Sequence, residues 1–147
     1  MVCKIVQIKK DYRMSGSPKK EGDEQLKIDY DLVREILLFV EDKSDGVHSF
    51  RSNKYVDNIG GNKETSIKVA YHVKFLIDVG YIEGDRTPFY NPLILDITPS
   101  GREFLSATRE QSVWVKTKEK LGTALADRTA GEVMNVAFKL TSKLFDL

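Results

Sequence analysis

Apolar residues follow a helical period in two long segments of the chain. In the first segment, from Ile28 to Asp42, the repeating apolar positions are Leu32, Val33, Ile36, Leu37 and Val40. This spacing predicts an amphipathic helix that neighbouring elements cover on most of its circumference. Asp29 or Asp31 is the expected N-cap, because a carboxylate accepts hydrogen bonds from the free N–H groups of the first turn.

The second segment runs from Asn62, the expected N-cap, to Asp78. Its core face carries Val69, Val73, Leu76 and Ile77. Gly80 is expected to end this helix by adopting a left-handed conformation. Between the two helices, residues 47–56 alternate weakly and suggest one or two short strands, and the glycine-rich residues 58–62 predict a turn. This arrangement leaves room for at most one helical turn before Asn62.

A hairpin and a further helix follow. Tyr81–Glu83 begins a strand, Gly84–Arg86 is a predicted turn, and the returning strand alternates through Leu93, Leu95 and Ile97. A proline at each end of residues 88–92 predicts a stiff connection around Phe-Tyr-Asn. Thr98 is the expected N-cap of the next helix, which has a proline at its first position.

The remainder of the chain is predicted to be helical. Trp114, Leu121 and Leu125 share one face of a segment with several lysines, and Thr129 with Glu132 matches a capping box before a last helix. We therefore predict an α+β fold: a winged helix-turn-helix with a short β-hairpin wing and additional carboxy-terminal helices. Residues 1–26 are interpreted as an amino-terminal extension and linker, and residues 27–147 as the winged-helix domain with its carboxy-terminal helical extension.

Two segments carry a family resemblance. YHVKFLIDVGYIEG, residues 71–84, and DITPSGREFLSATREQSVWVKTKEKL, residues 96–121, resemble a bacterial and phage family known only as a domain of unknown function. The resemblance begins near Lys27 and extends to the last helix. It implies a winged-helix core, a phage or prophage type of protein and a cytoplasmic location. It implies no activity and no catalytic residue.

Composition and charge narrow the class of protein. The chain has 147 residues, of which 41% are hydrophobic and 31% charged, which is typical of one soluble domain. No apolar run approaches the roughly 20 residues of a membrane-spanning helix, so no membrane contact is expected. The start of the chain lacks the features of a secretory signal, so we expect the protein in the cytoplasm. With a net charge of +1, the chain lacks the dense basic field of proteins that hold DNA mainly by its phosphates.

The sequence does not predict an enzyme, a metal site or a cofactor. His48 and His72 are the only histidines and Cys3 is the only cysteine. No His-Glu-x-x-His motif or cysteine cluster accompanies them, and the glycine pair at residues 60–61 lacks the spacing of a phosphate-binding loop. His72 is expected to be a partly buried side chain bonded to backbone. We therefore assign no catalytic residue and no metal ligand.

The predicted working surface lies on the side of the Asn62–Asp78 helix opposite its core face. The candidate binding residues are Lys63, Ile67, Lys68, Tyr71, Lys74, Phe75 and Arg86. Three of them are large apolar groups spaced four residues apart, which a merely solvated helix face does not need. The lysines and Arg86 suggest contacts with DNA phosphates and bases, as in helix-turn-helix modules.

Three hypotheses account for this surface. It binds double-stranded DNA, as expected of a regulatory accessory protein; it binds a protein partner or a second copy of the chain without DNA binding; or other parts of the same molecule cover it. Ile67 and Phe75 are poor groove-reading residues and Asp78 repels phosphate, which weighs against DNA. The sequence leaves these alternatives open.

Overall fold

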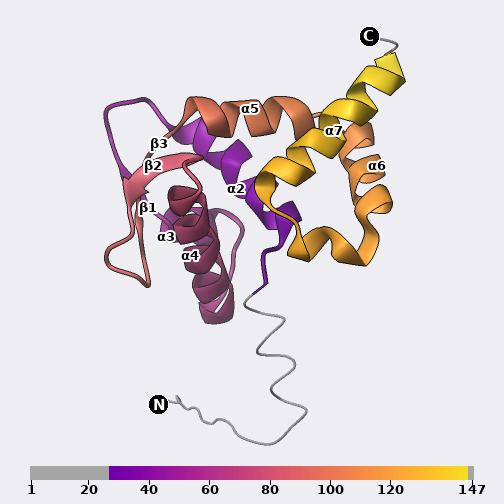
Figure 1. Cartoon of the computed structure of the whole chain (residues 1–147). Coiled ribbons are helices and arrows are strands. Elements are labelled where there is room, and N and C mark those ends of the chain that lie inside the picture. The colour runs from indigo at the N-terminus through magenta and orange to yellow at the C-terminus, as the bar shows by residue number, and fades with distance from the viewer. Residues whose placement is uncertain (1–26, 146–147) are drawn as a thin grey trace, which may run out of the picture.

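A computed structural model describes residues 27–145, with the side chains of residues 144 and 145 left out of the description (Figure 1). The extension and linker predicted for residues 1–26 lie outside the described residues. The described part contains six α-helices, one 3-10 helix and three strands, which makes it an α+β fold. None of its helices has both the length and the apolar character that crossing a bilayer requires.

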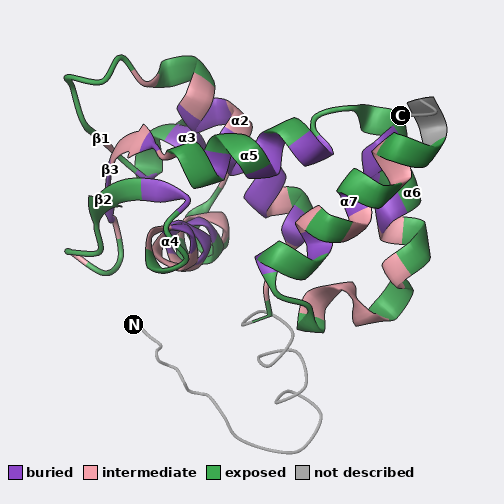
Figure 2. Cartoon of the chain, turned by 45° about the horizontal axis from the view of Figure 1, so that its top comes forward, coloured by how far each residue is buried: buried purple, intermediate pink, exposed green. Residues whose placement is uncertain are grey.

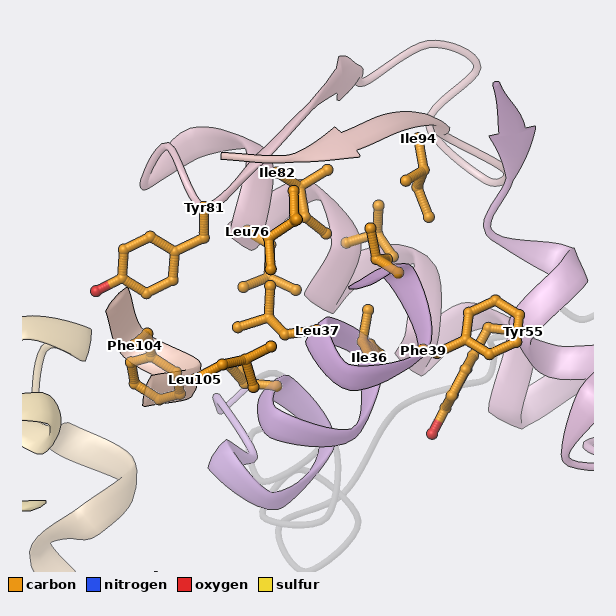
Figure 3. Close-up of a cluster of buried hydrophobic side chains, with 14 of the residues drawn as sticks. Ile36, Leu37, Phe39, Tyr55, Leu76, Tyr81, Ile82, Ile94, Phe104 and Leu105 are labelled. Atoms are coloured by element: carbon orange, nitrogen blue, oxygen red, sulfur yellow. The ribbon is translucent and has the colours of Figure 1, made fainter. Parts of the chain in front are cut away.

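Helix α2, Tyr30–Lys43, lies at the centre of the molecule. Asp29 is its N-cap, and the Asp29 carboxylate accepts hydrogen bonds from the N–H groups of Asp31 and Leu32. The helix packs against helix α4 (Lys63–Asp78), helix α5 (Pro99–Thr108) and strand β3 (Leu93–Ile97). Ile36 and Leu37 are fully buried and lie in the middle of the core cluster (Figure 3). The predicted first helix is confirmed, with Asp29 rather than Asp31 as its cap.

The segment after α2 differs from the prediction. Strand β1 is only Phe50–Arg51, and residues Asn53–Asn58 form a helix, α3, where a second strand was expected. Tyr55 and Val56, which favour strands locally, are both buried on this short helix. The Tyr55 ring packs edge to face against the Phe39 ring of α2, with 5.2 Å between ring centroids. Tertiary packing therefore overrides local strand preference here.

Helix α4, Lys63–Asp78, begins and ends as predicted. The side chain of Asn62 accepts a hydrogen bond from the Thr65 N–H, and Gly80 after the helix has a φ of 82°. Val69, Val73 and Leu76 are fully buried, so the predicted core face is confirmed.

The three strands form an antiparallel sheet in the order β1-β3-β2, with β2 at Ile82–Asp85 and β3 at Leu93–Ile97. Two predictions here were wrong. Gly84 continues the strand instead of opening the turn, and the buried residues of β3 are Ile94 and Ile97 instead of every second residue from Leu93. The second correction follows from a register shift in the pairing of the two strands.

The register shift leaves Leu95 without a partner on β2. Glu83 pairs with Asp96, whereas the next residue, Gly84, pairs with Ile94. An extra residue on one strand changes which face its neighbours point to, and it brings the two backbones close together. A Cβ atom at Gly84 would collide with the carbonyl oxygen of Leu93, so this position requires glycine.

The carboxy-terminal helices are α5 at Pro99–Thr108, α6 at Gln111–Leu121 and α7 at Ala130–Phe145, with the 3-10 helix η1 at Gly122–Asp127. The α7 helix packs against α5 and α6 (Figure 2). Its residues Val133 and Ala137 are fully buried. The predicted caps are confirmed: Thr98 accepts from the Gly101 N–H, and Thr129 and Glu132 cap each other's backbone N–H.

Buried Arg34 of α2 attaches these helices to the centre of the molecule. Its Nε and Nη2 atoms donate to the carbonyl oxygens of Thr108 and Arg109, at 2.8 and 2.9 Å. Its guanidinium carbon lies 5.8 Å from the ring centroid of Trp114. Trp114 in turn donates from Nε1 to Asp31 at 2.8 Å.

The order of elements from α2 to β3 and the strand order are compatible with the layout of a winged helix.

Candidate functional site

An open groove with a volume of about 940 Å³ runs along helix α4. We call it the α4 groove. Its walls come from residues 63–71 and Lys74 of α4, from Asp29 and Leu32, from the region around α3, and from residues 89–91 of the β2–β3 loop. Five predicted residues line it: Lys63, Ile67, Lys68, Tyr71 and Lys74. Phe75 and Arg86 do not.

The rim of the α4 groove is unusually apolar. The exposed fraction is 65% for Ile67, 70% for Phe89 and 68% for Tyr90, and Tyr71 is half-buried. Phe89 and Tyr90 form an edge-to-face pair with 5.6 Å between ring centroids. Large apolar side chains gathered on one surface are typical of interaction sites. The described carboxy-terminal helices contribute none of the lining, so they do not cover this surface.

Phe89 and Tyr90 belong to the loop of residues 86–92, which we call the hairpin loop. Side chains from the β1–α3 region hold both of its ends. Nη1 of Arg51 donates to the carbonyl oxygens of Thr87 and Asn91, at 3.1 and 3.3 Å. The Asn91 Oδ1 atom accepts hydrogen bonds from Ser52 Oγ and from the Asn53 N–H, at 3.2 and 3.0 Å. The loop therefore presents its two aromatic rings from a fixed backbone.

Two of the predicted cations have carboxylate partners. The Nζ atom of Lys68 lies 3.1 Å from Oδ2 of Asp29, and the Nε atom of Arg86 lies 3.3 Å from Oδ1 of Asp78. Both pairs are substantially exposed, so each is worth only a fraction of a kcal/mol to stability. Their effect on the charge of the surface matters more, because each pair places a negative charge beside the cation.

Lys63 and Lys74 are arranged differently. Among the described residues, no carboxylate oxygen lies within 4.0 Å of either ammonium group. The Nζ atom of Lys74 lies 5.4 Å from the centroid of the Phe89 ring, which attracts it through the electron-rich ring face. These two lysines supply most of the positive charge that the α4 groove offers to a ligand.

His72 fixes the position of α4 beneath the groove. It is fully buried, and Nδ1 donates to the Lys68 carbonyl oxygen while Nε2 accepts from the Asp29 N–H, both at 2.8 Å. Burial, which disfavours the imidazolium, lowers the pKa of His72. The same two backbone partners select the neutral tautomer with its proton on Nδ1. The predicted bonding of His72 to backbone is confirmed, although the ring is fully rather than partly buried.

The N-cap of α2 is part of the same junction. Burial opposes ionisation of Asp29 and is the largest single influence on its carboxylate. Hydrogen bonds from the Lys68 ammonium and the Leu32 N–H, together with nearby positive charge, chiefly that of Lys68, outweigh burial, so the pKa of Asp29 is lowered. Asp29 therefore stays ionised and holds Lys68 against one end of the α4 groove.

Phe75 lies apart from the other predicted residues. Its ring is half-buried against the main core and packs edge to face on Tyr30, with 6.4 Å between centroids. The apolar row of Ile67, Tyr71 and Phe75 is thus divided between surface and core. Its amino-terminal part faces the α4 groove, and its last residue supports α2.

The aromatic pair and the side chains that hold it were missed as site residues. Phe89 and Tyr90 were assigned only to a stiff connection, and Arg51 and Asn91 were assigned no role. The available signal was a pair of adjacent aromatic residues in a proline-flanked turn, where polar side chains are usual. The Arg51 and Asn91 contacts span about 40 positions of sequence, and a local pattern does not reveal them.

Neither histidine lies in a cluster of metal ligands among the described residues. His48 is exposed, with Nδ1 2.7 Å from Oδ2 of Asp45, and both nitrogens of His72 are engaged by backbone groups. Within residues 27–143, whose side chains are described, no three His, Cys, Asp or Glu residues gather as ligands of one ion.

Comparisons with known proteins place the chain in a family. The family model described as "Hypothetical protein (DUF2513)" matches residues 27–126. An uncharacterized protein of Haemophilus influenzae is 29% identical over 122 residues, which cover 81% of this chain and 98% of the relative. No solved structure matches the chain. The match begins at α2 and includes the α4 groove and the hairpin loop.

Proposed function

The chain belongs to the family of hypothetical proteins designated DUF2513, and we propose that it is a winged-helix protein that binds duplex DNA through the α4 groove. The observation that carries this proposal is the arrangement of α4 and the hairpin loop around one groove. In helix-turn-helix modules, the second helix of the motif enters the major groove while flanking segments grip the backbone. Here α3 and α4 correspond to the two motif helices, and β2 and β3 correspond to the wing.

The polar groups of the α4 groove suit this role. Lys63 begins α4, where free backbone N–H groups and the helix dipole also favour a phosphate. Lys74 lies about one turn before the end of the helix, beside the hairpin loop. Between them, Tyr71 offers a hydroxyl for hydrogen bonding and Ile67 a contact for a thymine methyl group. Modest positive charge with few phosphate contacts predicts moderate affinity and a shallow dependence on salt.

Salt-dependent binding tests the proposal. Fluorescence anisotropy with a labelled pool of duplexes is measured for the wild type and for the Lys63→Ala and Lys74→Ala variants. Each substitution should weaken binding to all sequences and reduce the slope of log K against log salt by about one. The matched control is Lys116→Ala, an exposed lysine of α6 that does not line the groove. Absence of any binding at low salt would remove DNA from consideration.

A second candidate function is contact with a protein partner or with a second copy of the chain. The exposure of Ile67, Phe89 and Tyr90 favours it, because aromatic residues are enriched at the centres of protein interfaces. Sedimentation of the wild type and of Ile67→Glu distinguishes self-association from binding of a different protein. A dimer that dissociates in the variant identifies self-association. The phage type and the cytoplasmic location that the resemblance implies remain predictions.

A further inference from the structure

We propose that Phe89 and Tyr90 form an aromatic wedge that enters the base stack of duplex DNA from the minor groove. The wedge would act at a flexible pyrimidine–purine step, where unstacking costs least. This inference rests on the proposed DNA-binding function and deepens it. In this proposal, the hairpin loop helps to select DNA sites that deform easily.

The first argument is the combination of exposure and rigidity. Both rings are about 70% exposed, with the two ring planes at 90° to each other. Hydrogen bonds from Arg51, Ser52 and Asn53 hold the loop ends, and Thr87 donates to Asp85 from both its N–H and its hydroxyl. A loop ordered before binding loses little conformational entropy when it inserts. The fold thus keeps two apolar rings in water on a fixed support.

The second argument is the charge around the rings. The Lys74 ammonium lies over Phe89, and the Arg51 guanidinium lies against the carbonyl oxygens of the loop. A wedge in the minor groove meets apolar base faces ahead of it and phosphates on both sides. An apolar rim bordered by cations matches this pattern. The Asp85 carboxylate already lies within electrostatic range of Arg51, so Lys74 is the cation that a purely apolar protein surface would leave facing no negative charge.

Measuring base unstacking tests the wedge directly. Two short duplexes of equal A·T content are compared, one with TA steps and one a continuous A-tract, each with a 2-aminopurine probe. Unstacking of the probe raises its fluorescence, and donor and acceptor dyes on the ends report bending. We expect the wild type to unstack and bend the TA duplex and to bind it about tenfold more tightly than the A-tract.

Three variants separate the wedge from other effects. In Phe89→Ala/Tyr90→Ala, binding should weaken about tenfold, the probe signal should disappear and the preference for TA steps should be lost. Because both rings are exposed, this variant should fold, which its thermal melt verifies. Tyr90→Phe keeps the ring and should keep the signal. Phe138→Ala, which removes an exposed ring from α7, is the matched control and should behave as the wild type.

The outcomes are distinguishable. Tight binding of duplex DNA without a probe signal or bend would refute the wedge and leave the DNA-binding function in place. Equal or tighter binding of the corresponding single strand would also refute it, because the rings would then serve as a stacking platform for unpaired bases. If neither duplex nor single-stranded DNA binds at low salt, both the DNA-binding function and the wedge are overturned. Self-association through the two rings would strengthen that conclusion.

Discussion

Replacing His72 should destabilise the fold by a predictable amount. In His72→Leu, the Asp29 N–H loses its acceptor, whereas the Lys68 carbonyl keeps the backbone N–H of residue 72 through the α-helical pattern. One partly buried donor is therefore left unsatisfied, at a cost of about 1–3 kcal/mol. Leucine is apolar and similar in size, so it fills the site. We expect a net loss of about 1–2 kcal/mol in the free energy of unfolding.

The same residue gives the wild type a dependence on pH. Burial holds the pKa of His72 in the folded state below its ordinary value of 6.5. Below pH 6.5, the unfolded state therefore binds more protons than the folded state, and stability falls as the pH falls towards the folded-state pKa. The contribution of His72 to stability is fully present above pH 6.5. His72→Leu removes this contribution, so its stability should change less between pH 7 and pH 5 than that of the wild type.

Urea denaturation followed by circular dichroism at several pH values measures both effects. His72→Gln is the informative control, because its side-chain oxygen reaches the position of Nε2 and can accept from the same N–H. It should recover part of the lost stability without restoring the pH dependence. His48→Asn is the control for the exposed histidine. A His72→Leu protein as stable as the wild type at neutral pH, or one with the same pH dependence, would refute the reasoning.

Three further substitutions test the packing and the caps. Gly84→Ala should lower the free energy of unfolding by about 1–3 kcal/mol, because the added methyl group has no room in the sheet. The thermal melt of Gly131→Ala should show no loss, because an added Cβ on α7 would meet only Oγ1 of Thr129, at 4.0 Å. Phe75→Glu should unfold or strongly destabilise the protein, whereas Ile67→Glu should leave the melt nearly unchanged; the opposite ranking would contradict the division of the apolar row. Thr129→Ala should cost about 1 kcal/mol in urea denaturation, and an unchanged midpoint would show that the capping box is dispensable.

The helix boundaries were the most predictable part of the fold. Asn62, Thr98 and Thr129 were identified as caps because cap chemistry involves residues only two or three positions apart. Two parts of the fold that were predicted wrongly, helix α3 and the inward positions of β3, depend on contacts between residues far apart in the sequence. Helix α3 is short, and its buried Tyr55 packs against the ring of Phe39 in α2. The inward positions of β3 depend on the register shift opposite Gly84, which no alternation within β3 could reveal.

The candidate site was predictable where it lay on one helix. Lys63, Ile67 and Tyr71 share the groove because residues three or four apart on a helix occupy one face. The contribution of the hairpin loop was not predictable in this way. The position of Phe89 above Lys74 is set by the conformation of the loop, which side chains of the β1–α3 region hold in place. Loop direction is a property of the folded molecule, whereas helix periodicity is a property of the sequence.

The first turn of α2 joins both halves of the molecule. Asp29 contacts His72 and Lys68 of α4, whereas Asp31, two residues later, contacts α6 through its bond from Trp114. Tyr30 between them packs on α4 and donates its hydroxyl to the backbone before α7. Local opening of either half therefore removes partners from the same three residues. We therefore expect the groove helix and the carboxy-terminal helices to unfold as one cooperative unit instead of two independent ones.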